Sequence, residues 1–259
     1  MIQSFVFEKM HGIGNDFVLI DNFHQKFNIT KGTVKLLANR HKGIGFDQLL
    51  LLEPSSIEGC DAAYRFFNPD GSEAQQCGNG QRCISYYLWK KNTHKKSFCV
   101  SGLAGLIYSE VLQNEQIKVN MGKTQAVNTL TIDSAQCHHV LLGNPHLVTE
   151  CKNVDSCDLE LLNKQLTGQY PDGINLEVVE IIGRDEIKIR VHERGTGETM
   201  ACGSGACAAV RALQTSGQLD NKVKVMLPGG LLVVEYDEID NNIYLTGAAT
   251  HVFTGEITL

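Results

Sequence analysis

Two cysteines occupy nearly the same glycine-rich surroundings in the two halves of this sequence. Cys77 lies in Gln76–Gly80 (QCGNG) and Cys202 lies in Ala201–Gly205 (ACGSG), 125 positions apart (202 − 77). A thiol can take up and release a proton, and two thiols on opposite faces of one carbon could invert its configuration. The two motifs therefore predict an enzyme that removes a proton from one face of a carbon and returns a proton to the other.

The similarity between the two halves extends beyond the cysteines. Glu73 and Glu198 precede them at the same offset, and Gly14–Asp16 (GND) is similar to Gly143–Pro145 (GNP) at an offset of 129 (143 − 14). Matching motifs at nearly the same offset indicate a duplicated structural unit. We therefore expect two related domains, each of which carries one of the cysteines.

Each cysteine motif leads directly into a segment with helical character. We predict helices over Gly80–Lys91 and Gly205–Ser216, the second rich in alanine, and a third helix over Thr33–His41. A cysteine at a helix N-terminus meets backbone N–H groups without intrahelical partners and the positive end of the helix dipole. Because both favour the thiolate, we expect the pKa of each thiol to fall below about 8.5.

The same N–H groups could bind an anionic substrate. The start of a helix is a ready site for a carboxylate, and glycines beside each cysteine let a ligand approach the backbone closely. A thiolate base next to a bound carboxylate suits removal of a proton from the adjoining carbon. The sequence therefore predicts acid–base chemistry at the α-carbon of a carboxylic acid.

Short runs with strand character fill most of the remaining chain, and several alternate apolar and polar residues. The expected strands are Phe5–Phe7, Phe17–Ile20, Gln48–Leu52, Ala63–Phe67, Gly105–Val111, Gln116–Met121, His138–Leu142, Asn175–Val179, Glu186–His192, Val223–Leu227, Leu231–Tyr236 and Asn242–Leu245. Few helices among many strands predict a fold of the α+β class. We place the boundary between the halves at Gly122–Gln125, which gives domains of residues 1–122 and 123–249.

Composition and charge exclude several classes of partner. The 259 residues are 42% apolar with a formal net charge of −6, and no basic cluster indicates nucleic-acid binding. No run of about 18 apolar residues predicts a membrane span, and the N-terminus lacks the features of a signal peptide. We therefore expect a cytoplasmic enzyme that acts on a small molecule.

The nine cysteines also bear on cofactors and disulfides. A disulfide framework is not expected in the cytosol. The absence of a Cys-x-x-Cys pair, and of histidines at ligand spacing from the cysteines, argues against zinc. We expect no metal site and no cofactor.

Five motifs together closely resemble the diaminopimelate epimerase family from end to end. They are Lys9–Phe17 (KMHGIGNDF), Phe67–Glu73 (FNPDGSE), Cys77–Cys83 (CGNGQRC), Gly143–His146 (GNPH) and Glu193–Cys207 (ERGTGETMACGSGAC). The resemblance implies two pseudo-symmetric domains, each a β-barrel-like sheet wrapped around a central helix, with the active site in the cleft between them. It also implies that a last strand at about residues 250–259 returns to the first domain.

The resemblance further implies cofactor-independent interconversion of L,L- and meso-diaminopimelate, in lysine and peptidoglycan precursor biosynthesis, by a homodimer. Cys77 and Cys202 would be the two catalytic acid–base groups, and His146 and Glu193 would support them. The substrate would be bound by Asn15, Gln48, Asn68, Gly78, Asn79, Asn144, Asn175, Glu193, Arg194, Gly203 and Ser204. Arg194 suits a bidentate contact with the distal carboxylate, and Glu193 suits the distal ammonium.

Other interpretations of these residues remain open. Asp16 and Asp70 could order loops, Glu73 and Glu198 could hold the cysteine loops, and His146 could be a core histidine. The segment after Asn175, Leu176–Val179, differs from the small and aromatic residues that are usual at this place in the family.

Three alternative functions also remain open. The nearest is an enzyme of the same scaffold acting on another substrate: a racemase of proline or histidine, or an isomerase of the phenazine-biosynthesis type, against which the paired cysteines argue. A nucleotide-binding oxidoreductase is suggested by Gly203–Ala208 (GSGACA), although a loop precedes this motif where a strand is required. A third is a thiol-redox protein that uses Cys77 and Cys202.

Overall fold

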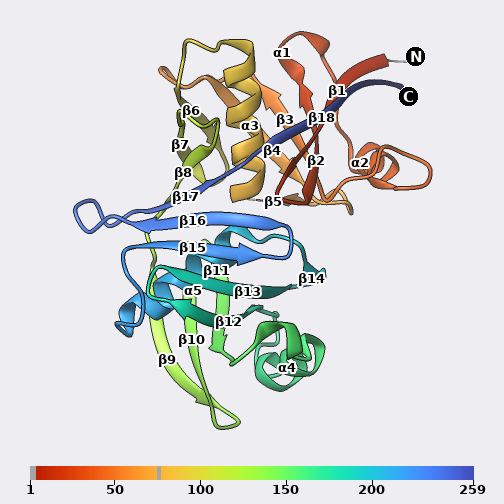
Figure 1. Cartoon of the computed structure of the whole chain (residues 1–259). Coiled ribbons are helices and arrows are strands. Elements are labelled where there is room, and N and C mark those ends of the chain that lie inside the picture. The colour runs from red at the N-terminus through yellow and green to blue at the C-terminus, as the bar shows by residue number, and fades with distance from the viewer. Residues whose placement is uncertain (1–3, 75–76) are drawn as a thin grey trace. The chain divides into compact units, whose positions relative to one another are not determined.

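The computed structural model describes residues 4–74 and 77–259. The chain forms two compact units (Figure 1). Unit 1 comprises Met1–Val119 and Ala248–Leu259, and unit 2 comprises Asn120–Gly247. The last strand joins unit 1 because β18 (Thr250–Thr258) pairs antiparallel with β1 (Ser4–Gly12), side by side in Figure 1.

Unit 1 consists of strands that surround one long helix, α3. Besides β1 and β18, its elements are β2 (Asn15–Asp21), α1 (Asn22–Gln25), α2 (Lys31–Ala38), β3 (Gln48–Glu53), β4 (Ala62–Phe67), β5 (Glu73–Ala74), α3 (Gly78–Lys91), β6 (Ser97–Gly102), β7 (Gly105–Val111) and the start of β8 (Ile117–Gly122). Helix α3 contacts β1, β2, β3, β7 and β18. The strands therefore enclose this helix on several sides.

Unit 2 repeats this arrangement around helix α5. Its elements are β9 (Ala126–Ile132), β10 (Ala135–Leu142), β11 (Asn144–Glu150), the 3₁₀ turn η1 (Val154–Ser156), α4 (Leu159–Thr167), β12 (Asn175–Gly183), β13 (Glu186–Glu193), β14 (Gly197–Thr199), α5 (Gly203–Thr215), β15 (Lys222–Leu227), β16 (Gly230–Tyr236) and β17 (Ile243–Gly247). Helix α5 contacts β9, β10, β11, β12, β16 and β17. The predicted α+β class, with strands around one helix in each half, is confirmed.

The two units share strand register as well as sequence motifs. Strand β4 pairs with β5 through Phe67 and Glu73, and β13 pairs with β14 through His192 and Glu198. Both partners are displaced by 125 positions (192 − 67 and 198 − 73), the same offset as the two cysteines. The repeat in the sequence is therefore a repeat of backbone pairing.

A parallel strand pair is also repeated. Strands β2 and β3 align Phe17 with Gln48, and strands β11 and β12 align His146 with Asn175. The partner offsets are 129 (146 − 17) and 127 (175 − 48). Gln48 and Asn175 thus begin equivalent strands in the two units.

The central helices differ in the side chains that allow them to be buried. Helix α5 is buried through small residues, Ala206, Ala208, Ala209 and Ala212 among them. These let the surrounding strands approach the helix closely, as the alanine-rich sequence predicts. Helix α3 instead buries polar residues in its first two turns, including Gln81 and Arg82.

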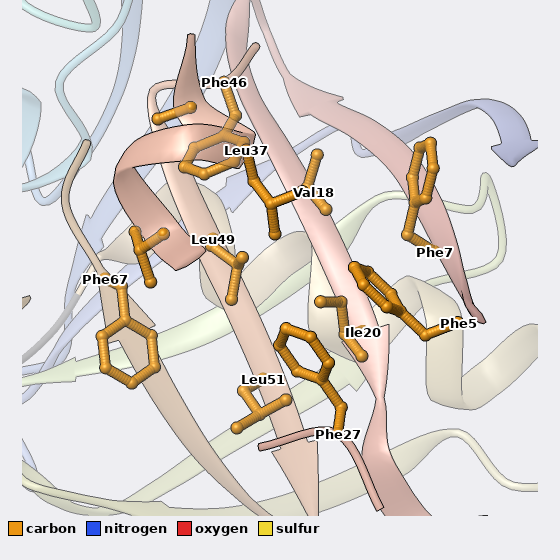
Figure 2. Close-up of a cluster of buried hydrophobic side chains, with 12 residues drawn as sticks. Phe5, Phe7, Val18, Ile20, Phe27, Leu37, Phe46, Leu49, Leu51 and Phe67 are labelled. Atoms are coloured by element: carbon orange, nitrogen blue, oxygen red, sulfur yellow. The ribbon is translucent and has the colours of Figure 1, made fainter. Parts of the chain in front are cut away.

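A separate apolar cluster packs on the outer side of β2 and β3 in unit 1, where α2 covers the strands (Figure 2). Val18 and Ile20 of β2, Leu49 and Leu51 of β3, and Leu37 of α2 are all buried in it. Alternate residues of each strand therefore face this cluster, while the intervening residues face α3. The strands that carry Asn15 and Gln48 are anchored on both faces.

None of the helices in residues 4–74 and 77–259 has both the length and the apolar content that a membrane-spanning helix requires.

Candidate active site

Both candidate catalytic cysteines are N-caps of the central helices. Cys77 precedes α3, and the Gly80 N–H donates to its Sγ at 3.4 Å. Cys202 precedes α5, and the Gly205 N–H donates to its Sγ at the same distance, 3.4 Å. The backbone is extended at both cysteines, as is usual for an N-cap.

The residues after each cysteine form the first turn of the helix. Gly78 and Asn79 are the first residues of α3, and Gly203 and Ser204 are the first residues of α5. Backbone N–H groups in a first turn have no intrahelical acceptor. Both helices therefore offer N–H donors beside a thiol, as the sequence predicts.

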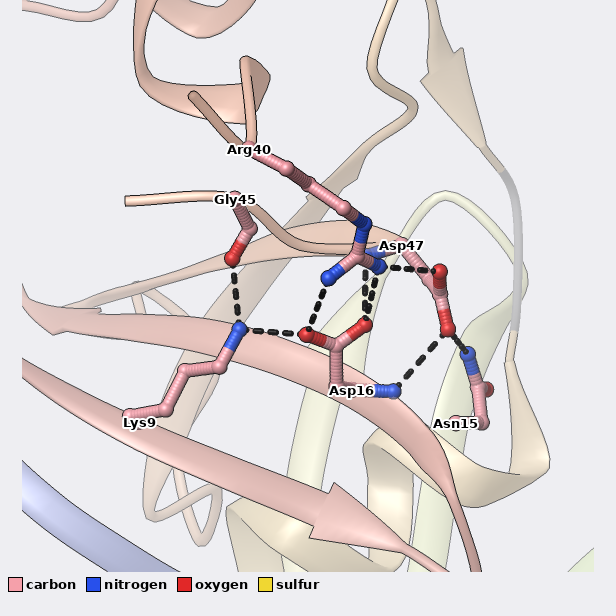
Figure 3. Close-up of polar contacts among 6 residues, drawn as sticks. All are labelled: Lys9, Asn15, Asp16, Arg40, Gly45 and Asp47. Atoms are coloured by element: carbon pink, nitrogen blue, oxygen red, sulfur yellow. Dashed lines mark hydrogen bonds and ion pairs between the residues drawn. The ribbon is translucent and has the colours of Figure 1, made fainter. Parts of the chain in front are cut away.

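Amide side chains surround the sulfur of Cys77 in unit 1. The thiol donates to Asn15 Oδ1 at 3.8 Å, and Asn79 Nδ2 donates to the same oxygen at 3.1 Å. Asn15 Nδ2 in turn donates to Asp47 Oδ2 at 2.9 Å (Figure 3). Asn15 and Asn79 are thus brought to Cys77, and Asp47 holds the orientation of the Asn15 amide.

An ion cluster anchors the loop behind Asn15 (Figure 3). Asp16 binds Lys9 and accepts from Arg40 at 2.7 and 3.1 Å. Burial alone would raise the pKa of Asp16, but hydrogen bonds from Arg40 and Lys9 lower this pKa to about 2. Arg40 also pairs with Asp47 at 2.8 Å. Asp16 therefore orders this loop and is a carboxylate at neutral pH.

Gln48 and Asn68 form a second polar pair in unit 1. Gln48 Nε2 donates to Asn68 Oδ1 at 3.0 Å, and Asn68 Nδ2 donates to Ser72 Oγ at 3.1 Å. Gln48 Oε1 is buried and has no hydrogen-bond partner among the described residues. Asp70 accepts from the Ser72 N–H and hydroxyl at 2.9 and 2.6 Å, so this carboxylate orders the loop.

Carboxylates surround the sulfur of Cys202 in unit 2. Cys202 is 5% exposed, and its pKa is raised well above the ordinary value, first by burial and then by Glu193 and Glu177. Hydrogen bonds from Ser204 and the Gly205 backbone oppose this rise and are outweighed. Our expectation of a lowered thiol pKa is therefore wrong for Cys202, because desolvation and two negative neighbours outweigh the helix dipole.

A buried histidine–carboxylate pair lies in the same half. His146 Nδ1 is 2.7 Å from Glu177 Oε1, and both side chains are fully buried. His146 Nε2 is 2.9 Å from Asn144 Oδ1. The sequence analysis missed Glu177, although one acidic residue inside the apolar run Leu176–Val179 was a visible signal.

Glu193, Arg194 and Asn175 meet where β12 begins and β13 ends. Thr199 Oγ1 donates to Glu193 Oε1 at 2.6 Å, and burial is the main reason that the Glu193 pKa is raised. The Arg194 N–H donates to Asn175 Oδ1 at 2.9 Å. The Arg194 guanidinium donates to Asp172 O at 3.3 Å and forms no ion pair within residues 4–74 and 77–259.

Two arginine–glutamate pairs brace the strands that lead to the cysteines. Arg65 binds both carboxylate oxygens of Glu73 at 2.8 and 3.0 Å. Arg190 binds both oxygens of Glu198 at 2.6 and 2.8 Å. The arginines are again 125 positions apart (190 − 65), a match that the sequence analysis missed. Glu73 and Glu198 therefore tie β5 to β4 and β14 to β13, ahead of the two cysteines.

Comparison with known proteins identifies the family. The sequence model of diaminopimelate epimerase matches residues 7–127 and 139–252, which include both cysteines. The chain belongs to the diaminopimelate epimerase family. This membership supports an isomerase activity.

Solved structures share the fold at low sequence identity. The chain is similar to a PhzF-family phenazine biosynthesis protein from Bacillus anthracis, with a TM-score of 0.76 and 18% identity over 99% of this chain and 100% of that one. It is also similar to a hydroxyproline epimerase from Agrobacterium vitis, with a TM-score of 0.75 and 12% identity over 99% and 93% of the two chains. A methylitaconate-delta-isomerase matches with a TM-score of 0.69 and 12% identity over 100% and 96%.

Proposed function

We propose that this member of the diaminopimelate epimerase family is a two-base epimerase that interconverts L,L- and meso-diaminopimelate without a metal or organic cofactor. The observation that carries the proposal is the pair of cysteine N-caps, built alike on α3 and α5. In this proposal the enzyme acts in the cytoplasm as a homodimer and contributes to lysine and peptidoglycan precursor biosynthesis.

In the proposed mechanism the two thiols exchange roles. One of Cys77 and Cys202, as the thiolate, removes the α-proton, and the other, as the thiol, donates a proton to the opposite face of the carbon. Backbone N–H groups in the first turns of α3 and α5 bind the α-carboxylate and stabilise the negative charge that develops on it. After turnover the thiol and the thiolate have exchanged positions, so the enzyme is ready for the reverse reaction.

The choice of diaminopimelate rests on groups that suit a second amino acid end. The aliphatic part of the Arg194 side chain lies along Gly173, where an added methyl group would be 2.8 Å from Cδ. The guanidinium donates to Asp172 O, and its remaining donors suit a carboxylate. Asn68, whose Oδ1 accepts from Gln48 and has a further lone pair, supplies an acceptor that suits an ammonium group. A racemase for proline or histidine would not need groups that bind a second carboxylate and a second ammonium.

Deuterium exchange tests the proposal. The purified chain is incubated in deuterated water, without added cofactor, with L,L-diaminopimelate and, in parallel, with proline, trans-4-hydroxy-L-proline and histidine. We expect deuterium at the α-carbon and formation of the meso isomer only with diaminopimelate. Exchange into proline or histidine, with none into diaminopimelate, would assign the fold to a different amino-acid racemase.

A further inference from the structure

Unit 2 contains a buried polar pair at positions where unit 1 is apolar. His146 stands opposite Asn175 in the parallel pair of β11 and β12, as Phe17 stands opposite Gln48 in unit 1. Glu177 lies two residues after Asn175, and Leu50 lies two residues after Gln48.

All four side chains of these two pairs are fully buried: Phe17, Leu50, His146 and Glu177. The fold therefore accommodates either an apolar or a polar pair at these two positions.

Packing alone does not explain the polar pair. Removing a carboxylate and an imidazole from water is costly, and well-packed apolar residues often replace buried ion pairs without loss of stability. Glu177 Oε2 is buried with no hydrogen-bond partner among the described residues, so the desolvation of the carboxylate is only partly offset. A structural role would be met as well by the leucine that unit 1 carries.

The hydrogen bonds define what the pair does. Asn144 Oδ1 can only accept, so His146 Nε2 donates to it at 2.9 Å. His146 Nδ1 and Glu177 Oε1 then share one proton at 2.7 Å, whichever of them carries it. Glu177 thereby fixes the imidazole ring, and the ring fixes the Asn144 amide with its Nδ2 donors directed away from His146.

The pair also lies against the helix start that carries Cys202. A methyl group added at Gly205 would lie 2.6 Å from Glu177 Oε1 and 3.2 Å from Cys202 Sγ. In unit 1, a methyl group at Gly80 would instead meet Leu50 Cδ2 at 3.3 Å. Glu177 thus takes the place of Leu50 beside the catalytic helix.

We propose that Glu177 is a positioning residue of the Cys202 half-site, which acts through His146 to orient the Asn144 amide toward the substrate and places a second carboxylate beside the Cys202 thiol. This inference rests on the proposed epimerase function and assigns a role to a residue outside the predicted site.

Three variants separate orientation from packing. The double variant His146→Phe with Glu177→Leu rebuilds in unit 2 the apolar pair of unit 1. Glu177→Leu removes the carboxylate alone, and Glu177→Gln keeps an acceptor for His146 Nδ1. Val178→Ala is the matched control, because Val178 is the next residue of β12, is fully buried, and faces the apolar cluster on the other side of the strand.

We expect the double variant to fold, by circular dichroism, and to lose about 10²-fold in kcat/KM, the loss typical of a misplaced catalytic group. Glu177→Gln should retain more kcat/KM than Glu177→Leu because it preserves the imidazole orientation. Val178→Ala should lower the melting temperature and leave kcat/KM close to wild type. A folded double variant with wild-type kcat/KM would overturn the inference.

A second readout needs no substrate. The proton shared by His146 Nδ1 and Glu177 should give a slowly exchanging resonance in the wild-type NMR spectrum. It is assigned by its loss in His146→Phe and is distinguished by ¹⁵N labelling of the imidazole from the Nε2 proton donated to Asn144. We expect this resonance to disappear in Glu177→Leu and to persist in Val178→Ala. Its persistence in Glu177→Leu would overturn the inference. If the wild type does not exchange diaminopimelate, the proposed function fails, and the kinetic comparison is made on the amino acid that it does exchange.

Discussion

Within its own unit, each cysteine has the same backbone arrangement but different side chains around it. Both sulfurs accept from a glycine N–H at 3.4 Å at the start of a central helix. Around Cys77 the polar neighbours from unit 1 include the amides of Asn15 and Asn79. Around Cys202 they include the carboxylates of Glu193 and Glu177. Duplication preserved the positions of the groups, and the side chains around them diverged.

In unit 1 a carboxylate, Asp47, contacts the Asn15 amide that accepts from the Cys77 thiol. Asp16 and Asp47 are ion-paired with Arg40, and Asp47 accepts from the Asn15 amide and so orients it. In unit 2 the carboxylates act on Cys202 directly, and Pro145 stands where unit 1 has Asp16 (145 − 16 = 129). The groups that each unit places around its own cysteine therefore differ.

The largest expected effect comes from removing either thiol. Cys77→Ala and Cys202→Ala should each lower epimerisation by 10⁴-fold or more, since loss of one acid–base group typically costs roughly 10²–10⁴-fold and both groups are needed in each turnover. Cys83→Ala is the control, because Cys83 is fully buried on α3 outside the proposed machinery. Substantial epimerisation by either cysteine variant, measured by the formation of the meso isomer, would contradict the two-base mechanism.

A smaller effect should distinguish the two helix starts. An alanine Cβ at Gly205 would lie 2.6 Å from Glu177 Oε1, whereas at Gly80 the closest atom is Phe66 Cε1 at 3.2 Å. Gly205→Ala must displace the buried carboxylate, so we expect a loss in kcat/KM of about 10²-fold. Gly80→Ala should lose less, because side-chain carbons can move by a few tenths of an ångström. Equal losses of kcat/KM in the two variants would show that the position of the Glu177 carboxylate beside Cys202 does not affect catalysis.

The ion cluster around Asp16 in unit 1 should make the stability of the fold depend on pH in acid. Asp16 is ionised in both the folded and the unfolded chain at neutral pH. Because its pKa is about 2 in the folded chain, below the value in the unfolded chain, its ionisation stabilises the folded chain by about 2 kcal/mol at that pH. This stabilisation is present above pH 4 and is lost as the pH falls toward 2, because the unfolded chain takes up the proton first. Asp16→Asn should therefore lower the free energy of unfolding at pH 7 and have little effect near pH 2. Denaturant unfolding at several pH values measures this difference, and a cost independent of pH would contradict the assignment.

Metal removal should have no effect. In the proposed mechanism the thiols and the helix N–H groups carry out every step, so activity should survive exhaustive dialysis against a chelator. The measurement is the rate of α-proton exchange before and after dialysis, with added Mg²⁺ and Zn²⁺ as controls. Activity that is lost on dialysis and restored by a metal would require a different mechanism.

Local patterns in the sequence predicted the elements that carry the cysteines. The helices expected over Gly80–Lys91 and Gly205–Ser216 are α3, Gly78–Lys91, and α5, Gly203–Thr215. The glycine motif and the helical pattern both lie within one segment, which is why they could be recognised. Helix α4 was missed although Asp158 at its N-cap, which accepts from the Leu161 N–H at 3.0 Å, was a usable signal.

Features that depend on tertiary contacts could not be predicted. The sequence indicates a helix dipole at Cys202 but not that the thiol is buried beside two carboxylates, so the direction of its pKa shift was wrong. His146 and Glu177 are 31 residues apart and meet only because β11 and β12 pair in parallel. The short strands β5 and β14 have too few residues to show a strand pattern, and that Arg65 and Arg190 pair with Glu73 and Glu198 is seen only in the structure.

The most direct test of two opposed bases uses diaminopimelate analogues with a leaving group at the β-carbon. Removal of the α-proton then expels that group, so a single thiolate is sufficient and each cysteine can be tested alone. Cys77→Ala and Cys202→Ala are each given both isomers at the α-carbon, and release of the leaving group is measured. We predict that the two variants prefer opposite isomers. Equal turnover of the same isomer by both variants would contradict the account.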